Sequence, residues 1–422
     1  MAQTSSLVLP ELLAPAGSLE KLQMAVHYGA DAVYLGGKQH SLRARAANFS
    51  QEDLAVGVAY AHERGVKVYA TVNIFAHNDD LAGLATSLRF LAEAKVDACI
   101  VADPGVIRLA RKHVPGMPLH LSTQANVTNW EHARFWEEQG IARLNLAREL
   151  GLKEIEVIRA RVSSQLEVFV HGALCISYSG RCLLSTYFTG RDANQGDCAQ
   201  PCRYSYALVE EKRPGQYFPV EEDERGAYIF NSRDLCLLAH LPKLVRAGVD
   251  SLKIEGRMKS VGYVGAVVHL YREALQWIQA QAATGADMDT LSLPDDFFQE
   301  LDAIGTRGHT ENFFLGSPDA QDMLHHATRV AQSVVPVGIV RGASPLTIET
   351  RHVLAPGDEL ECLLPGRLKA LRARVTALTD EAGQTLEQAD LRDFWSPLAM
   401  RLQTEPALTG LEPHTLLRKK LS

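Results

Sequence analysis

The stretch ELLAPAGSLEKLQMAVHYGADAVYLG, residues 11–36, contains the unit that decides the fold of this chain. Two short apolar runs, Glu11–Ala14 and Ala32–Leu35, flank a segment whose apolar residues recur at spacings of three and four. The runs are typical of buried strands, and the spacing is typical of an amphipathic helix. Gly29 follows the helical segment, as a helix C-cap does. The stretch therefore predicts a strand–helix–strand unit.

The same pattern recurs to about residue 260. The further predicted strands are Val66–Val72, Ala98–Ala102, Leu119–Thr123, Arg143–Leu146, Glu167–His171 and Ser251–Glu255. Eight strands alternating with helices favour a parallel sheet, and eight is the number that closes a TIM-like (β/α)8 barrel. An open doubly wound sheet is the alternative, but no G-x-G-x-x-G follows the first strand. We therefore predict an α/β fold with a TIM-like barrel in residues 1–330.

Two segments depart from this pattern. Residues 175 to about 226 are rich in Gly, Asn, Gln and Pro and are too long for an ordinary βα loop. A candidate extra strand, Ala227–Asn231, follows them. From Val334 onward, short apolar runs alternate with Gly, Pro and Asp turns, as in small all-β domains. We expect a cysteine-rich insertion within the first barrel and a small C-terminal β-barrel domain in residues 334–422.

The composition limits the class of protein. A chain of 422 residues with 46% hydrophobic and 22% charged residues is typical of a globular protein with more than one domain. The net charge of -7 excludes a broadly basic nucleic-acid binder, although not a local basic patch. The sequence has neither a long uncharged apolar run nor a signal-peptide pattern at its N-terminus. We therefore expect a cytoplasmic protein without membrane contact, whose cysteines are thiols or metal ligands.

Four of the seven cysteines lie close together in the sequence, in the pattern C-x6-C-x15-C-x3-C. They are Cys175, Cys182, Cys198 and Cys202. Four thiolates suit either zinc or an iron–sulfur cluster, and the wide first gap fits a cluster better than the short knuckles of zinc sites. Four buried free thiols are the alternative. Cys236, which comes after the extra strand, competes with Cys202 as the fourth ligand.

Polar side chains recur at the carboxyl ends of the predicted strands, where barrel enzymes place their chemistry. In EVFVH, the alternation of strand residues predicts that Glu167, Phe169 and His171 share one face. Glu167 and His171 are candidates for proton transfer, since buried ionisable groups are costly unless they are paired or functional. An interior ion-pair layer is the alternative for Glu167.

Two further groups are candidates for binding a substrate. Lys253, Glu255 and Arg257 alternate at the end of the last strand, so they either bind an anion or satisfy one another. Asn73 and Gln124 end two earlier strands and suit a base or another small ligand. In the second domain, basic residues could contact an RNA backbone or form a basic edge that discourages strand pairing. These are Arg367, Lys369, Arg372, Arg374, Arg418, Lys419 and Lys420.

These motifs resemble those of a known family. EVFVHGALCISYSGRCLLS, residues 167–185, resembles the signature of the U32 peptidase family. ELLAPAGSLEKLQMAVHYGADAVYLGG resembles the opening segment of that family, RDANQGDCAQPCRYSY its second cysteine pair, and NSRDLC with AGVDSLKIEGRMKS its closing barrel segment. TRGHTENFF is similar to a downstream element, with Asn312 where Gly is expected. SLRARAANF, the insertion and the trailing β domain look most like the tRNA-hydroxylation branch.

The resemblance implies an activity, a cofactor and partners. The activity would be an O2-independent, [4Fe–4S]-dependent hydroxylation of wobble uridine 34 in tRNA to 5-hydroxyuridine, linked to prephenate. The cluster ligands would be Cys175, Cys182, Cys198 and Cys202. Sister branches hydroxylate a ribosomal RNA cytidine or act in ubiquinone synthesis. No obligate protein partner is inferred.

Two other classes of function are alternatives. Other members of the family carry a protease label, and His171 with Cys175 suggests a Cys–His pair. However, the sequence has neither a G-x-S-x-G elbow nor an H-E-x-x-H helix, and a cysteine bound to iron is not a free nucleophile. Proteolysis is therefore the weaker hypothesis. A non-catalytic binding protein with a structural zinc ion is the third.

Overall fold

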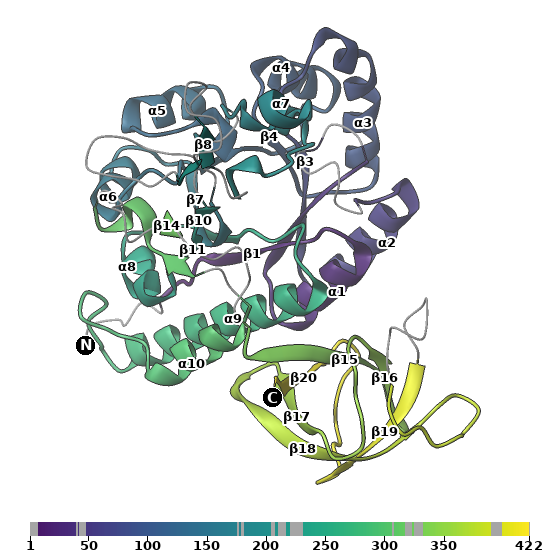
Figure 1. Cartoon of the computed structure of the whole chain (residues 1–422). Helices are drawn as coiled ribbons and strands as arrows, with labels where there is room; N and C mark the ends of the chain where they lie inside the picture. The colour runs from purple at the N-terminus through teal and green to yellow at the C-terminus, as the bar shows by residue number, and fades with distance from the viewer. Residues whose placement is uncertain are drawn as a thin grey trace.

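Eight parallel strands close into a barrel in the N-terminal part of this computed structural model (Figure 1). They are β1 (Glu11–Pro15), β2 (Ala32–Gly36), β3 (Lys67–Val72), β4 (Ala98–Val101), β5 (Leu119–Leu121), β6 (Arg143–Asn145), β7 (Gln165–Ala173) and β12 (Ser251–Ile254). β12 pairs with both β1 and β7, which closes the sheet. All eight predicted strands are confirmed, and the alternative of an open sheet is wrong.

The structure describes most of the chain. The described residues are 7–38, 41, 48–174, 177–178, 181–203, 207–209, 217–219, 231–305, 308–316, 323–324, 332–389 and 399–421. Cys175 and most of the SLRARAANF stretch lie outside them, as does Ala227–Phe230 of the candidate extra strand.

Helices surround the strands of the barrel. They are α1 (Leu19–His27), α2 (Gln51–His62), α3 (Leu81–Glu93), α4 (Pro104–His113), α5 (Trp130–Glu138), α6 (Leu152–Arg159), α8 (Leu241–Arg246) and α9 (Val261–Ala283), followed by α10 (Asp295–Ala303). Ser18, Ser50 and Asp103 cap the starts of α1, α2 and α4 by accepting backbone N–H groups. Gly29 ends the first helical segment with a φ of 88°, as predicted. None of the described helices is long and apolar enough to cross a membrane.

The cysteine-rich insertion lies between β7 and β12. Its described elements are α7 (Leu184–Thr189), two 3-10 turns, η3 (Ala193–Gln195) and η4 (Pro201–Arg203), and the strands β8 (Ala207–Val209), β9 (Tyr217–Pro219) and β10 (Asn231–Ser232). The chain then forms β11 (Asp234–Cys236), which pairs antiparallel with β7 and parallel with β13 (His309–Thr310). β11 therefore extends the sheet outside the closed barrel.

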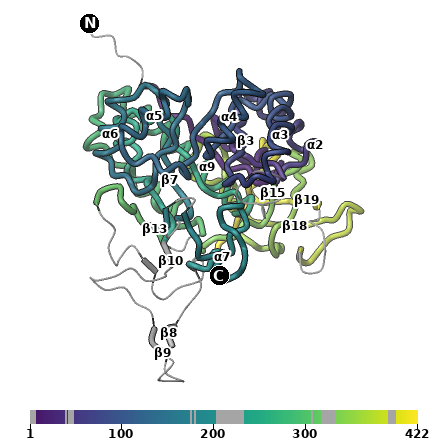
Figure 2. The backbone as a smooth tube through the Cα atoms, turned by 90° about the horizontal axis from the view of Figure 1, so that it is seen from above, coloured from purple at the N-terminus to yellow at the C-terminus, as the bar shows by residue number. Residues whose placement is uncertain are grey.

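A second, antiparallel barrel closes the C-terminal part of the chain, which confirms the predicted β-barrel fold of this part. Its strands are β15 (Val334–Ala343), β16 (Leu346–Thr350), β17 (Glu359–Leu364), β18 (Arg367–Thr379), β19 (Ala399–Glu405) and β20 (Leu416–Lys420), in the order β15-β16-β19-β18-β17-β20. Figures 1 and 2 show it beside α9, on one side of the first barrel.

The two barrels share buried contacts. The Tyr28 hydroxyl donates to the carbonyl oxygen of Leu363 at 3.0 Å and accepts from the backbone N–H of Leu416 at 2.8 Å. Arg418 Nη2 lies 2.7 Å from Glu300 Oε2 of α10, and Arg418 Nε lies 3.0 Å from Glu361 Oε2. Ile339, Leu363 and Leu416 belong to the core of the first barrel. Polar and apolar contacts together therefore fix the second barrel to the first.

These contacts correct the expectation for the basic residues. Arg418 is only 5% exposed and holds the two barrels together, so its prediction as part of an RNA-contact surface is wrong. Arg372 and Arg374 remain exposed but pair with Glu361 and Glu359. β18 pairs on both sides within a closed barrel, so the alternative of a basic sheet edge is also wrong.

Candidate functional site

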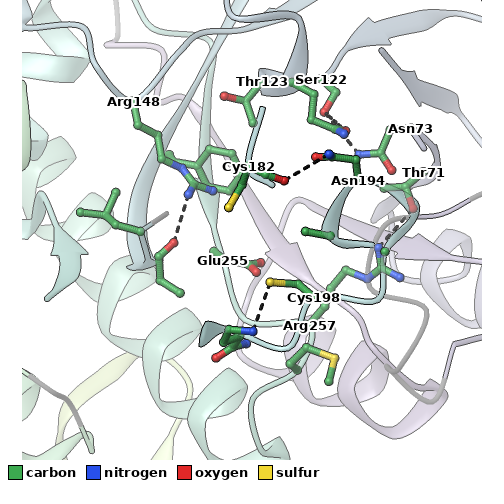
Figure 3. Close-up of a pocket in the computed structure, with 18 of the residues that line it drawn as sticks. Thr71, Asn73, Ser122, Thr123, Arg148, Cys182, Asn194, Cys198, Glu255 and Arg257 are labelled. Carbon is green, nitrogen blue, oxygen red and sulfur yellow. Dashed lines mark hydrogen bonds between the residues drawn. The ribbon is translucent and has the colours of Figure 1, made fainter. Parts of the chain in front are cut away.

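A pocket of about 210 Å³ lies at the carboxyl ends of the barrel strands (Figure 3). This is the end at which TIM barrels place their active sites. Its lining comes from β2, β3, β4, β6, β7 and β12, from the turn after β5, from the segment after β12 and from the cysteine-rich insertion. The pocket brings together all five predicted substrate-binding residues, namely Asn73, Gln124, Lys253, Glu255 and Arg257. The five residues therefore lie together, and their role in binding a substrate stays a prediction.

Three of the predicted metal ligands line the same pocket: Cys182, Cys198 and Cys202. Cys175 lies outside the described residues, and it directly follows Leu174, which lines the pocket. Hydrogen bonds hold the neighbouring backbone: Asn194 Nδ2 donates to the carbonyl of Cys182 at 3.2 Å, and Arg191 Nη2 to that of Cys198 at 3.1 Å. Figure 3 shows Cys182 and Cys198 among the polar side chains of the pocket.

The chemistry of these donors fits an iron–sulfur cluster. Among the described residues, no three His, Cys, Asp or Glu side chains are close enough to form a site for a single metal ion. A cubane spans several iron atoms and takes its thiolates from separate points around it. The sulfur of Cys198 already accepts a hydrogen bond from the backbone N–H of Gln200 at 3.3 Å, and hydrogen bonds of this kind tune cluster thiolates. Three thiols on one pocket, with a fourth cysteine adjoining it in sequence, match such a ligand set.

Cys236 lies apart from these cysteines. It is on β11, behind β7, and its Sγ lies 3.8 Å from the hydroxyl of Tyr271 on α9. Cys236 is only 9% exposed, and burial raises the pKa of its thiol to about 11. Cys202 lines the pocket beside Cys182 and Cys198 and Cys236 does not, so the geometry favours Cys202 over Cys236 as the fourth ligand.

Glu167 belongs to an ion-pair layer inside the barrel, below the pocket. Its Oε1 lies 2.7 Å from Lys253 Nζ, and its Oε2 lies 3.4 Å from Arg143 Nη1. Arg143 also contacts Glu11 Oε1 at 2.6 Å. Glu167 does not line the pocket, whereas its partner Lys253 does. These contacts agree with the alternative of an interior ion-pair layer, and the role of Glu167 in proton transfer stays a prediction.

His171 faces α9 and not the pocket. β7 pairs with β12 in regular register from Glu167 to Phe169, but the next pair is His171 with Ile254. This β-bulge inserts one residue and reverses the alternation of side chains beyond it. The ring of His171 therefore packs against Tyr263 and Tyr271 of α9. Of Glu167, Phe169 and His171, Phe169 alone lines the pocket. The expectation that His171 shares a face with Glu167 and Phe169 is wrong.

The environment of His171 gives no support to its predicted proton-transfer role. Burial lowers the pKa of this histidine to about 3, with a further contribution from His309, so the imidazole is neutral at physiological pH. Its Nδ1 lies 3.2 Å from the hydroxyl of Tyr271, a buried group. A side chain that is 2% exposed and absent from the pocket lining has no path to a substrate there.

Arg257 gives the pocket a cationic wall. Its guanidinium donates to Ser41 Oγ at 3.0 Å, Thr71 Oγ1 at 3.2 Å and Asn48 Oδ1 at 2.6 Å, all of which are neutral acceptors. Gly36, at the end of β2, leaves room for this arrangement because a Cβ there would overlap Arg257 Nη2. A guanidinium stays protonated at physiological pH, so Arg257 contributes a positive charge to the lining of the pocket.

Lys253 and Glu255 are largely satisfied by the protein. Burial lowers the pKa of Lys253, an effect that the adjacent Glu167 opposes. Glu255 Oε2 accepts from the hydroxyl of Tyr34 at 3.0 Å and from the backbone N–H of Gly256 at 2.8 Å. Glu255 is the one acidic side chain among the described lining residues.

Asn145 and Arg148 are among the polar residues of the pocket that sequence reasoning missed. Asn145 ends β6, and Arg148 follows it three residues later. Arg148 donates to the carbonyl of Ala173 at 3.1 Å, and its guanidinium carbon lies 4.0 Å from the centre of the Phe169 ring. The position of Asn145 at a strand end is the same signal that identified Asn73 and Gln124, so the sequence alone was sufficient to predict this residue.

The fold and the site define a class of protein: a TIM-like barrel with a cysteine-bearing pocket at its mouth and a small β-barrel attached to its outer helices. Residues 17–324 match the model of peptidase family U32, and the chain belongs to this family. tRNA hydroxylation protein P1 of Bacillus subtilis is 40% identical over 386 residues, which cover 90% of this chain and 89% of that protein. tRNA hydroxylation protein P of Escherichia coli is 37% identical and covers 94% of this chain and 96% of its own. The 23S rRNA 5-hydroxycytidine synthase of Escherichia coli is 34% identical over 88% of this chain and 55% of its own length.

Proposed function

We propose that this protein is an RNA-modifying hydroxylase that converts wobble uridine 34 of tRNA to 5-hydroxyuridine. The observation that carries the proposal is the convergence of three cysteines with neutral hydrogen-bonding side chains and a buried arginine in one pocket. Relatives of nearly the same length are named for tRNA hydroxylation, and a further relative is named for 5-hydroxycytidine in ribosomal RNA. Hydroxylation of RNA is the activity that these names share.

Cys175, Cys182, Cys198 and Cys202 would hold a [4Fe–4S] cluster at the pocket. Bound there through four thiolates, the cluster would supply redox chemistry. The co-substrate in this proposal is prephenate, a dicarboxylate. Arg257 and Arg148 are the guanidinium groups of the lining, and a guanidinium binds a carboxylate through two parallel hydrogen bonds.

The remaining side chains of the pocket bind and orient the base. Asn73 and Gln124 present amide groups, and Phe169 offers an aromatic face beside the Arg148 guanidinium. The Glu255 carboxylate opens on the same space and is placed to accept the proton that leaves carbon 5 of the base. The exposed side chains Arg372 and Arg374 of the second barrel are candidate contacts for the tRNA backbone outside the pocket.

The first experiment is an anaerobic purification with a visible absorption spectrum and iron and sulfide analysis. A brown protein with about four irons per chain is expected for a cubane held by four thiolates. The second readout is mass spectrometry of tRNA nucleosides from cells that lack the protein. Loss of 5-hydroxyuridine and its derivatives, restored by the wild-type chain, supports the proposal. A metal-free or zinc-bound protein together with unchanged tRNA nucleosides would overturn it.

The protease alternative finds little support in the described residues. His171 is buried, neutral and absent from the pocket, so it cannot activate a nucleophile there. Cys236, its cross-strand neighbour, has a raised pKa and is a thiol rather than a thiolate at neutral pH. A metal-free protein that cleaves peptides, and loses that activity on Cys175→Ala, would restore this alternative.

A further inference from the structure

Two buried amide side chains of the pocket lack protein partners for one polar atom each. Gln124 is 3% exposed and Asn145 is 2% exposed, and both line the pocket. Within the part of the chain that the structure describes, Gln124 Nε2 and Asn145 Oδ1 are buried and make no hydrogen bond. Native proteins rarely leave such atoms unsatisfied, so each indicates a missing partner that fits it.

A hydrogen-bond relay fixes the orientation of the Gln124 amide. Asn73 Nδ2 donates to Ser122 Oγ at 3.3 Å, and the Ser122 hydroxyl donates to Gln124 Oε1 at 3.2 Å. The Ser122 hydroxyl has a single proton, and in this arrangement it gives that proton to the oxygen of Gln124. Gln124 therefore presents N–H donors to the pocket. Figure 3 shows Asn73 and Ser122 at the start of this relay.

Asn145 and Gln124 come from neighbouring strand ends. β5 and β6 pair in parallel, with Leu121 opposite Leu144; Asn145 ends β6, and Gln124 lies in the 3-10 turn η2 (Thr123–Ala125) that follows β5. Both side chains line the pocket. The two side chains thus offer a donor, Gln124 Nε2, and an acceptor, Asn145 Oδ1, to the same space. Their ligand needs a carbonyl next to an N–H group.

We propose that Gln124 and Asn145 read the edge of a uracil ring and exclude cytosine, an inference that rests on the function proposed above. Uracil presents a 4-carbonyl beside its ring imide N–H, whereas cytosine presents an amino group beside an unprotonated ring nitrogen. Gln124 Nε2 donates to the 4-carbonyl, and Asn145 Oδ1 accepts the imide N–H. With cytosine, Gln124 Nε2 faces the amino group of the base and Asn145 Oδ1 faces its unprotonated ring nitrogen, so neither hydrogen bond forms. Because the 4-carbonyl adjoins carbon 5, the same contact positions the reacting atom.

The contacts predict a change of base preference in one isosteric variant. Gln124→Glu replaces the donor by a carboxylate, which accepts hydrogen bonds from a cytosine amino group. The binding of three anticodon stem-loop RNAs is compared, with uridine, cytidine or 3-methyluridine at the wobble position. The wild-type protein is expected to bind the uridine RNA about 10- to 100-fold more tightly than the other two. Gln124→Glu is expected to bind the cytidine RNA at least as tightly as the uridine RNA.

Two further variants complete the test. Asn145→Ala removes the acceptor, so the uridine and 3-methyluridine RNAs are expected to bind within about 3-fold of each other. Gln51→Glu, on the exposed surface of α2, makes the same chemical change far from the pocket and is expected to keep the wild-type preference. Thermal unfolding by circular dichroism confirms that each variant is folded.

The outcomes separate this inference from the proposed function. A wild-type protein that restores 5-hydroxyuridine in cells, while Gln124→Glu keeps its preference for the uridine RNA, overturns the inference and leaves the function standing. Equal binding of the uridine and 3-methyluridine RNAs by the wild-type protein overturns the inference as well. Absence of 5-hydroxyuridine in complemented cells contradicts the function itself.

Discussion

Lys253 Nζ lies 2.7 Å from Glu167 Oε1 in the interior of the first barrel, where both side chains are almost completely buried. Lys253 also lines the pocket, and its ammonium group lies 4.5 Å from the centre of the Tyr34 ring and 5.3 Å from that of Phe169. The pair therefore connects the ion-pair layer to the floor of the candidate site. Removing either partner leaves a buried charge with weaker compensation.

The first prediction concerns Glu167. Glu167→Gln should lower the free energy of unfolding by about 3–5 kcal/mol, because Lys253 and Arg143 then lose a buried carboxylate. Urea unfolding measures this change. Glu63→Gln, which removes a carboxylate from an exposed pair with Arg64, should cost less than about 1 kcal/mol. A Glu167→Gln protein of normal stability that makes no product would instead favour direct participation of Glu167 in the chemistry.

The second prediction separates the cysteines. Cys182→Ser, Cys198→Ser and Cys202→Ser should each reduce the iron content and visible absorbance of anaerobically purified protein, since each removes a proposed ligand. Cys236→Ala should retain both, because that thiol lies behind β7 and not in the pocket. Iron loss in Cys236→Ala with full iron in Cys202→Ser would show that the assignment of the fourth ligand is reversed.

The third prediction concerns the contact between the barrels. Arg418→Met leaves Glu300 and Glu361 without their buried guanidinium, which should cost about 3 kcal/mol or more. We expect scanning calorimetry to show two transitions where the wild-type protein shows one. Arg374→Met provides the matched control, since Arg374 and Glu359 are both mostly exposed. A single, unshifted transition in Arg418→Met would mean that the apolar contacts alone hold the barrels together.

The fourth prediction concerns the loss of folding stability at acidic pH. Burial lowers the pKa of His269, at the contact between the barrels, to about 4, whereas an unfolded histidine titrates near pH 6.5. Between these values the unfolded chain binds the extra proton, so stability is complete above pH 6.5 and falls as the pH decreases toward 4. At pH 5 this one histidine should account for a loss of about 2 kcal/mol.

His269→Leu tests the acid prediction, because leucine keeps an apolar side chain in the buried site and cannot be protonated. Urea unfolding at pH 7 and pH 5 should show a smaller loss of stability in the variant than in the wild-type protein, by about 2 kcal/mol. His113→Leu, at the end of α4, is the control, and it should leave the difference between the two pH values unchanged. An identical pH dependence in His269→Leu and the wild-type protein would exclude this histidine as the cause.

The strands and the pocket were predictable because local chemistry determines them. Buried parallel strands appear as short apolar runs, and positive-φ glycines such as Gly29 mark the helix ends between them. Once the strands are located, the residues at their carboxyl ends must converge, which is why Asn73, Gln124 and Arg257 share one pocket. The same argument applies to Asn145, which ends β6 and lines the same pocket.

The errors concern features that depend on distant parts of the chain. The alternation in EVFVH gives no sign of the bulge, because the bulge is set by the pairing of β7 with β12, some 80 residues away. Arg418 looks like a surface residue in a basic C-terminal segment, and only the approach of α10 buries it. The sequence around each residue contains no information about these partners.

The bulge in β7 also determines which face of the strand the side chains beyond it take. Because of a single extra residue, Phe169 and His171 point to opposite faces of the same strand. Phe169 lines the pocket, and His171 packs beneath α9. Deleting Val170 would remove the extra residue and would leave His171 opposite Ile254, so the later part of the strand would keep its present partners. Spacing along the chain alone therefore does not specify which face of β7 a side chain takes, because one inserted residue changes that face for the positions beyond it.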